Sequence, residues 1–283
     1  MKPPEFDYAA PDSLDEAVAL LQGSDDAKVL AGGQSLVPLL NFRLAAPALL
    51  VDLRRVPGLD VIERRNGFVR IGAMVRQRAA EESALLSETV PLLGQALKHV
   101  AHPQIRSRGT VGGSIAHADP AAELPALLVA LDGRVCVASA RAERWIDARD
   151  LYTGFLGTCL EADEVLTSIE LPVAAPRTGA ACVELARRAG DYALCGALVQ
   201  ATRDSNGGIE DIRVALIGVG QRPHRATASE HALRAGATTS EAAALAADGL
   251  NLVSDPQTSA SYRRQLARTL VRRGFDLALE RSR

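Results

Sequence analysis

The sequence predicts an α+β protein, with a larger N-terminal domain and a smaller C-terminal domain that combines an antiparallel sheet with helices. Three observations lead to this fold class. The length of 283 residues corresponds to about two domains. Within the first 120 residues, two Gly-Gly pairs each come before a helix-forming segment. After the Pro-containing stretch 172–176, alternating segments are followed by helical ones, an order typical of an α+β domain.

The composition excludes several classes of function. Hydrophobic residues make up 47% of the chain, charged residues 23%, and the net charge is −2, which gives no basic footprint for nucleic acid. The longest apolar runs, such as residues 125–131, are too short to span a bilayer, so no transmembrane segment is expected. Residues 1–5 lack the apolar core of a signal peptide, which predicts a cytoplasmic protein.

The four cysteines do not form a metal-binding pattern. Their spacings of 13 to 23 residues include no CxxC pair, so neither a zinc site nor an iron–sulfur cluster is expected in this chain. We interpret them as reduced and mostly buried thiols. Electron transfer by this protein would therefore require an organic cofactor here or a metal in a partner.

The N-terminal half begins with alternating strands and helices. Residues 6–9 predict a strand, and Asp12 to Glu16 form a capping signature for a helix with Leu14, Val18 and Leu21 on one face. Residues 28–31 predict a buried strand that leads directly into the first Gly-Gly pair. A helical turn over residues 36–40 would then direct its N–H groups towards an anion.

The rest of the first domain predicts mainly strands. Asn66-Gly67 between two apolar segments is a strong hairpin signal, and residues 89–101 have helical spacing. The stretch 101–131 predicts an extended basic segment, a Thr-Val-Gly-Gly-Ser turn and an apolar helix. The predicted strands are residues 49–53, 59–63, 68–71, 134–138, 142–146 and 164–171.

The second domain has a simpler pattern. Asn206-Gly207-Gly208 is predicted to turn the chain between two strands of an antiparallel sheet. We expect the helices to cover one face of that sheet. The predicted strands are residues 181–186, 196–202 and 209–218, and the predicted helices are residues 226–235, 240–252 and 259–279.

Both Gly-Gly loops are candidate phosphate-binding sites. Adjacent glycines can present backbone N–H groups to a ligand without a Cβ in the way, and Thr110 and Ser114 add hydroxyl groups to the second loop. The alternative is that each pair simply turns the chain. Neither loop has the G-x-G-x-x-G pattern of a Rossmann unit or the terminal G-K-[ST] of a P-loop.

Several motifs together resemble the FAD-binding medium subunit of the molybdenum hydroxylases, the carbon monoxide dehydrogenase and xanthine dehydrogenase family. They are the two glycine loops, the Glu-Leu-Pro end of the strand at residue 172, the segment RRAGDY at 187–192 and the segment GVGQRPHRA at 218–226. The likeness covers nearly the whole chain. It implies a two-subdomain FAD-binding domain of the vanillyl-alcohol-oxidase (PCMH) type at residues 1–174 and an α+β C-terminal domain at residues 177–283.

The resemblance also implies which residues contact FAD. The two loops would line the diphosphate from opposite sides, and backbone amides suit that dianionic group. No catalytic residue and no metal ligand is implied in this chain. The implied cofactor-binding residues are Lys28, Val29, Leu30, Ala31, Gly32, Gly33, Gln34, Ser35, Val100, Gly109, Thr110, Gly112, Gly113, Ser114, Glu123, Leu166, Glu184 and Tyr192.

Four of these positions have specific implied roles. Glu123 matches an acidic residue that faces the adenosine ribose, although an acid in the first turn of a helix is also favoured by the helix dipole. Leu166 would pack on the flavin region. Tyr192 would shield the isoalloxazine, or else belong to the core of the second domain. Glu184 stands where many relatives have lysine, near the flavin pyrimidine edge, or else points to solvent between inward-facing neighbours.

The implied function is electron transfer within a heteromeric enzyme. A large partner subunit with molybdenum cofactor would hydroxylate the substrate, a small partner would carry two [2Fe–2S] clusters, and FAD in this chain would pass electrons to NAD, a quinone or oxygen. A dimer of heterotrimers is expected. The alternatives are a self-contained flavin oxidase, against which no paired base and nucleophile is apparent, and a non-catalytic nucleotide-binding module.

Overall fold

The computed structural model describes residues 2–282, and its first part is a small α/β subdomain. Its parallel sheet has the order β1-β3-β2, with β1 at Asp7–Ala9, β2 at Ala27–Leu30 and β3 at Leu49–Asp52. Helix α1 (Leu14–Gln22) begins where the Ser13 hydroxyl accepts a hydrogen bond from the Glu16 N–H, as the capping signature predicts. Helix α2 (Leu36–Asn41) follows the first glycine loop.

The second part is a five-stranded antiparallel sheet covered by helices. Its order is β4-β5-β10-β6-β7, so the long strand β10 (Val165–Pro172) lies at the centre. Asn66 and Gly67 both have positive φ in the predicted hairpin between β4 and β5. The other strands are β4 (Ile62–Arg65), β5 (Phe68–Gly72), β6 (Arg134–Ala138) and β7 (Glu143–Asp147).

The helices of this second part carry most of its core. Helix α5 (Pro91–His99) buries Leu92, Leu93 and Leu97, and α8 (Glu123–Ala130) is buried on nearly all sides. The remaining elements are η1 (Leu53–Arg55), α3 (Gln77–Glu82), α4 (Ala84–Thr89), α6 (Pro103–Arg106), α7 (Val111–His117), α9 (Ala148–Leu151), β8 (Tyr152–Gly154) and β9 (Gly157–Thr158).

The C-terminal part is an antiparallel sheet between two helical layers. One face packs on the long helix α12 (Ala260–Arg281) together with α10 and α11, and the other packs on α5 and α8 of the preceding part. The sequence predicted that helices cover one face of this sheet. That is correct for the helices of the C-terminal part, but the other face is also covered, by α5 and α8 of the preceding part. The other elements are β11 (Thr178–Ala186), β12 (Ala193–Arg203), β13 (Ile209–Ile217), β14 (His224–Arg225), α10 (Thr227–Arg234) and α11 (Thr239–Ala244).

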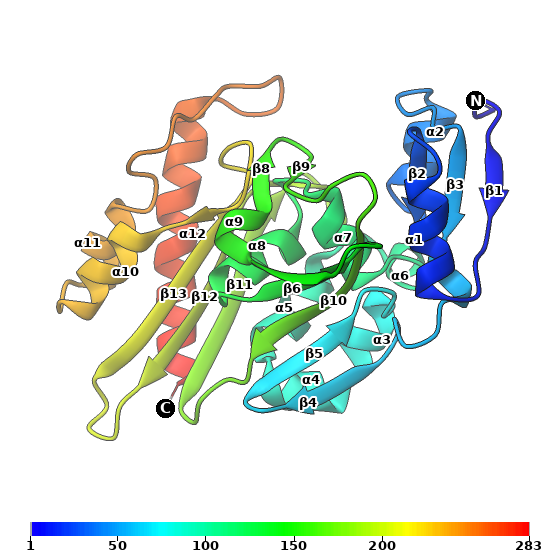
Figure 1. Cartoon of the computed structure of the whole chain (residues 1–283). Helices are drawn as coiled ribbons and strands as arrows, with labels where there is room; N and C mark the ends of the chain where they lie inside the picture. Colours follow the sequence, from blue (N-terminus) through cyan, green and yellow to red (C-terminus); the bar gives the residue numbers. More distant parts are fainter. Residues whose placement is uncertain (1, 283) are drawn as a thin grey trace.

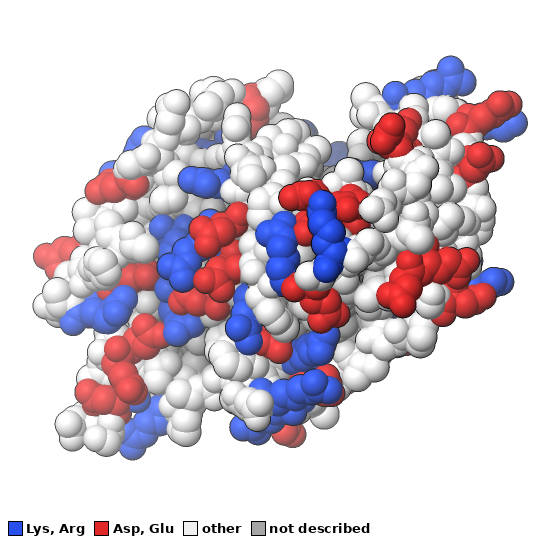
Figure 2. Space-filling model, in the orientation of Figure 1, with Lys and Arg blue, Asp and Glu red and all other residues white. Residues whose placement is uncertain are grey.

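Figure 1 shows the three parts in a row, with the N-terminal subdomain at the right and the C-terminal part at the left. Figure 2 shows a notch at the top of this face between the N-terminal subdomain and the rest. Figure 2 shows acidic and basic side chains interspersed on this face. Oppositely charged side chains pair in the structure, as Arg144 does with Glu164. Among residues 2–282, no helix is long and apolar enough to cross a membrane.

Three predicted segments are wrong in detail. The strand expected at residues 59–63 begins at Ile62, because Leu59 lies in a turn whose carbonyl accepts from the Met74 N–H. The helix expected at residues 240–252 ends at Ala244 and continues as turns up to Gly249, which has positive φ. The basic segment before the second glycine loop contains helix α6, and the Thr-Val-Gly-Gly-Ser stretch is the start of helix α7 rather than a turn.

Candidate active site at the glycine loops

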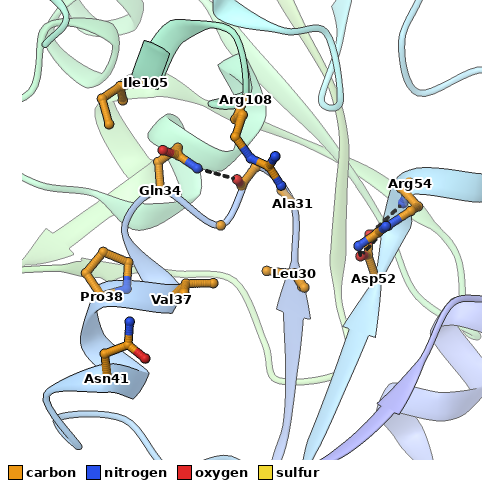
Figure 3. A pocket seen from close by; sticks show the side chains of 12 residues that line it. Leu30, Ala31, Gln34, Val37, Pro38, Asn41, Asp52, Arg54, Ile105 and Arg108 are labelled. Atoms are coloured by element: carbon orange, nitrogen blue, oxygen red, sulfur yellow. Dashed lines mark hydrogen bonds and ion pairs between the residues drawn. The ribbon is translucent and has the colours of Figure 1, made fainter. Parts of the chain in front are cut away.

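The first glycine loop connects β2 to α2 and leaves its amide groups free. The N–H groups of Gly32, Gly33, Gln34 and Ser35 donate no hydrogen bond to another described residue. The Gln34 side chain donates to the Gly32 carbonyl, which supports the loop from within (Figure 3). Successive free N–H groups in a loop form a concave anion-binding site.

This loop borders a cavity of about 430 Å³ between the N-terminal subdomain and α6. Figure 3 shows Ile105 and Arg108 on one side of the loop and helix α2 on the other. The lining residues are Leu30, Ala31, Gly32, Gly33, Gln34, Val37, Pro38, Asn41, Asp52, Arg54, Ile105 and Arg108.

The two arginines of the cavity differ in their partners. Arg54 pairs with the buried Asp52, which also accepts from the Tyr8 hydroxyl. Burial alone would raise the pKa of Asp52, but the hydrogen bonds from Arg54 and Tyr8 lower it, so this pair is neutral overall. Arg108 is exposed and forms no ion pair within residues 2–282. Its charge is therefore available to an anionic ligand.

The second glycine loop uses its amide groups inside the protein. The N–H groups of Val111 and Gly112 donate to the carbonyls of Val75 and Ala73, and the Gly113 N–H donates to the Thr110 hydroxyl at 3.0 Å. The Ser114 N–H donates to the Thr110 carbonyl. The prediction that these glycines present free N–H groups to a phosphate is therefore wrong, because α7 begins here and its first amides are already bonded.

These glycines allow close packing instead. A Cβ on Gly112 would stand 2.5 Å from the Ala73 Cβ, and one on Gly32 would stand 2.4 Å from the Arg108 carbonyl oxygen. A Cβ on Gly113 would come within 3.4 Å of the Ala31 Cβ. The two loops therefore pack against each other, and only the first has free donors.

Helix α7 leads from the loops towards the C-terminal part. His117 in its last turn is partly buried, which lowers its pKa, while Asp119 and the exposed Lys28 act on it with opposite signs. Asp119 accepts from the Ala121 N–H in a tight turn and does not cap α8. Ser114 and His117 are half-buried on the same helix.

Buried carboxyl groups occur at the start of α8 and on β11, the latter beside the half-buried His99. The Glu184 carboxylate on β11 is 3.3 Å from Nδ1 of His99 on α5, and its other oxygen, Oε2, has no hydrogen-bond partner among the described residues. The hydrogen bond to Glu184 raises the pKa of His99. Burial, reinforced by the charge of Glu184, raises the pKa of Glu123 to about 8.

The structure excludes one of the two alternatives at Glu184 and one at Tyr192. The Glu184 side chain is only 8% exposed and faces α5, so the expectation that it points to solvent is wrong. Tyr192 is 64% exposed, so it does not belong to the second-domain core. Partial desolvation and then the charges of Asp119 and Glu123 raise the pKa of Tyr192.

Two other implied cofactor-binding residues, Leu166 and Val100, are buried. Leu166 is buried on β10 beside Val137, and Val100 ends helix α5 with its carbonyl bonded to Arg106. Sequence reasoning missed Arg108, the Asp52–Arg54 pair and His99. Arg108 could have been found from its position directly before Gly109, whereas nothing in the sequence connects His99 with Glu184. Residues 2–282 contain no group of His, Cys, Asp and Glu suited to hold a metal ion.

Comparison with known proteins identifies this arrangement. Residues 4–174 match the model of the FAD-binding domain in molybdopterin dehydrogenase, and residues 180–278 match that of the CO dehydrogenase flavoprotein C-terminal domain. The chain belongs to the FAD-binding subunits of the molybdenum hydroxylase family. The predicted family and fold class are thus confirmed, and the chain is a flavoprotein subunit of an oxidoreductase.

Individual members of this family resemble the chain over its full length. The 6-hydroxypseudooxynicotine dehydrogenase complex subunit alpha of Paenarthrobacter nicotinovorans is 43% identical over 288 residues, covering 100% of this chain and 97% of that protein. The structure of quinoline 2-oxidoreductase from Pseudomonas putida 86 matches at 40% identity with a TM-score of 0.94, covering 99% of both chains. Carbon monoxide dehydrogenase from Hydrogenophaga pseudoflava matches at 38% identity with a TM-score of 0.96, also covering 99% of both.

Proposed function

We propose that this chain binds FAD between its two glycine loops and relays electrons from the [2Fe–2S] clusters of a small partner subunit to a final acceptor. The four free N–H groups of residues 32–35 carry this proposal. Bound FAD would supply the conversion between single-electron transfer from the clusters and two-electron transfer to the acceptor.

The residues present fit the diphosphate of FAD. That group carries about two negative charges, and the loop offers aligned backbone donors together with the unpaired guanidinium of Arg108. The second loop contributes close packing: a Cβ on Gly113 would stand 2.6 Å from the Thr110 hydroxyl oxygen, so glycine allows this loop to lie against Ala31 of the first. Of the second loop, the half-buried Ser114 offers a side-chain hydroxyl for the ligand, whereas Thr110 is fully buried and its hydroxyl accepts from the Gly113 N–H.

The residues around Glu123 support placing the isoalloxazine ring, rather than the adenosine ribose, at this end of the site. The charge of Glu184 raises the pKa of Glu123, and the charge of Glu123 raises the pKa of Tyr192, which supports placing the three residues at the same end of the site. The ribose and the isoalloxazine of an extended FAD lie at opposite sides of the diphosphate. We therefore assign the isoalloxazine to this cluster, under the exposed Tyr192 ring, and the adenosine to the cavity beside Pro38 and Ile105.

We further propose that the subunit works with two partners, a large molybdenum-cofactor subunit and a small iron–sulfur subunit, assembled as a dimer of heterotrimers. The absence of a metal-binding group within residues 2–282 supports this division of labour. All four cysteines are free, which supports a reducing, cytoplasmic location. Residues 1–174 would form the FAD domain and residues 177–283 the C-terminal domain.

The substrate of the complex is proposed to be an N-heteroaromatic compound rather than carbon monoxide or an aldehyde. Relatives named for nicotine 6-hydroxylation and caffeine dehydrogenation are 41% and 42% identical, and the quinoline enzyme is 40% identical. The medium chains named for carbon monoxide are 37% identical, and the one named for glyceraldehyde is 34% identical. The large subunit would select the substrate. The sequence identity of this subunit bears on the substrate only if the two subunits have evolved together.

Purification of the complex from its source tests these proposals. We expect FAD to be the only cofactor bound to this chain. We also expect the chain to co-purify with molybdenum and iron–sulfur subunits and to turn over substrate only in their presence. Reoxidation of the substrate-reduced complex by NAD, a quinone or oxygen then identifies the acceptor. Turnover by the isolated chain at the rate of the complex would support the self-contained oxidase instead, and a chain that never binds FAD would support a non-catalytic nucleotide-binding module.

A further inference from the structure

Two residues at the start of α3, Arg76 and Gln77, hold the segment that connects α6 to α7. The Gln77 N–H donates to the Gly109 carbonyl at 2.9 Å, and Arg76 forms an antiparallel bridge with Thr110. The buried Gln77 side chain packs on Gly109, since a Cβ there would stand 2.6 Å from Gln77 Oε1. Arg108, which directly precedes Gly109, is therefore joined to a well-supported piece of backbone.

The Arg76 guanidinium makes a further contact with this segment. Its Nη1 donates to the Arg108 carbonyl, and the Arg108 N–H donates to the Ile105 carbonyl at 3.1 Å. Both backbone polar groups of Arg108 are thus bonded, which fixes the direction in which its side chain leaves the backbone. Within residues 2–282 no carboxylate pairs with Arg76, although Asp60 lines the same small hollow.

The Arg108 carbonyl also lies against the first glycine loop. A Cβ on Gly32 would stand 2.4 Å from this carbonyl oxygen, and Gly32 is the first of the four residues with free N–H groups. The Arg108 side chain lines the cavity beside that loop (Figure 3). The contacts of Arg76 therefore determine where the backbone that carries the Arg108 guanidinium lies relative to the free donors.

We propose that Arg76 is a positioning residue for FAD, which holds the Arg108 backbone so that the Arg108 guanidinium faces the diphosphate. This inference rests on the proposed FAD site. A long arginine side chain loses rotamer freedom when it binds a ligand, and a fixed backbone leaves fewer side-chain positions to be lost. Arg76 acts through Arg108, so it contributes to FAD affinity only while the Arg108 guanidinium is present.

A double-mutant cycle tests this dependence. Titration calorimetry measures the FAD dissociation constant of the full-length chain, within its purified complex freed of flavin, for the parent, Arg76→Ala, Arg108→Ala and the double variant. We expect Arg76→Ala to weaken FAD binding roughly fivefold to tenfold. The double variant should bind within about twofold of Arg108→Ala, because no guanidinium then remains to be positioned. A merely structural role of Arg76 would not produce this coupling.

Three comparisons sharpen the cycle. Arg76→Lys keeps a charged donor for the single bond to the Arg108 carbonyl and should recover most of the affinity. Arg78→Ala is the matched control: it removes a guanidinium of the same helix that pairs with Glu81 and Glu82, and it should leave FAD affinity unchanged. ADP carries the diphosphate without the flavin, so it should show the same coupling as FAD.

The outcomes separate the inference from the proposed function. Losses in the two single variants that multiply in the double variant, unchanged affinity in Arg76→Ala, or coupling with FAD that is absent with ADP would each overturn the inference. Arg76→Met keeps the aliphatic stem and removes the donors, so it completes the cycle if the alanine variant does not fold. Failure of the parent protein to bind FAD would instead overturn the proposed function.

Discussion

The two glycine loops have similar sequences and opposite uses of their backbone. In the first loop, the amides of residues 32–35 are free and border a cavity. In the second, the amides of residues 111–114 are all bonded within the protein, and the glycines permit contact with Ala73 and with the first loop. A Gly-Gly pair therefore indicates only that there is no room for a Cβ at these positions. Whether the neighbouring space holds a ligand or another part of the protein decides if the pair binds or packs.

Gly112→Ala is expected to have the largest effect, because the new Cβ would overlap backbone atoms of Ala73 that cannot move independently. We expect the free energy of unfolding to fall by about 3 kcal/mol. The folded fraction should bind FAD with unchanged affinity. Gly94→Ala is the matched control: this helical glycine has open space around it, so alanine should stabilise the protein by about 0.5–1 kcal/mol. Chemical denaturation with parallel FAD titration measures both quantities.

Arg108→Ala tests the charge beside the first loop. Loss of a charge-assisted hydrogen bond to the diphosphate costs about 1.5–3 kcal/mol, so FAD should bind roughly tenfold to hundredfold more weakly. Stability without FAD should not change, since Arg108 forms no ion pair in the described part of the chain. Arg149→Ala, which removes an exposed ion pair with Asp147, should leave FAD affinity unchanged. Equal affinities of the two variants would remove Arg108 from the site.

Thr110→Val tests the internal role of the second loop. It removes the acceptor of the Gly113 N–H and so leaves the start of α7 uncapped, which should destabilise the protein by about 1–2 kcal/mol. Thr110→Ser retains the hydroxyl and should recover most of this loss. A thermal unfolding series compares the three proteins, and a valine variant as stable as the parent would mean that the Gly113 amide has another partner, such as a ligand.

Gly33→Ala should have the smallest effect on folding and a selective effect on binding. Gly33 has φ of +72°, so alanine is strained by about 1 kcal/mol, and relief of that strain would turn the free amides away from the ligand. FAD affinity should fall roughly tenfold. Gly207→Ala carries a similar strain, at φ of +85°, in a hairpin far along the sequence. Gly207→Ala should lower the free energy of unfolding by a similar amount and leave the FAD affinity unchanged. Calorimetry measures both quantities.

The sequence predicted most of the secondary structure because helix caps, turn residues and apolar spacing each depend on only a few neighbouring residues. Ser13 caps α1 through the Glu16 N–H, Asn66-Gly67 turns a hairpin, and the apolar spacing of residues 92–97 marks the buried face of α5. The α7 start was missed for an equally local reason. Thr110 caps a helix that contains two glycines, which are weak helix formers, so its helical register was not apparent from propensity.

The sequence by itself determined the family, the order of the elements and the two glycine loops that meet in the fold, because these features are set by residue type and short spacing. The tertiary structure alone decided which amides stay free, since the acceptors for residues 111 and 112 are carbonyls of residues 73 and 75. It also decided the burial of Glu123, which raises the pKa of that carboxyl to about 8. The ion pair between His99 and Glu184 likewise joins residues from elements far apart in the sequence, so no local spacing could have predicted it.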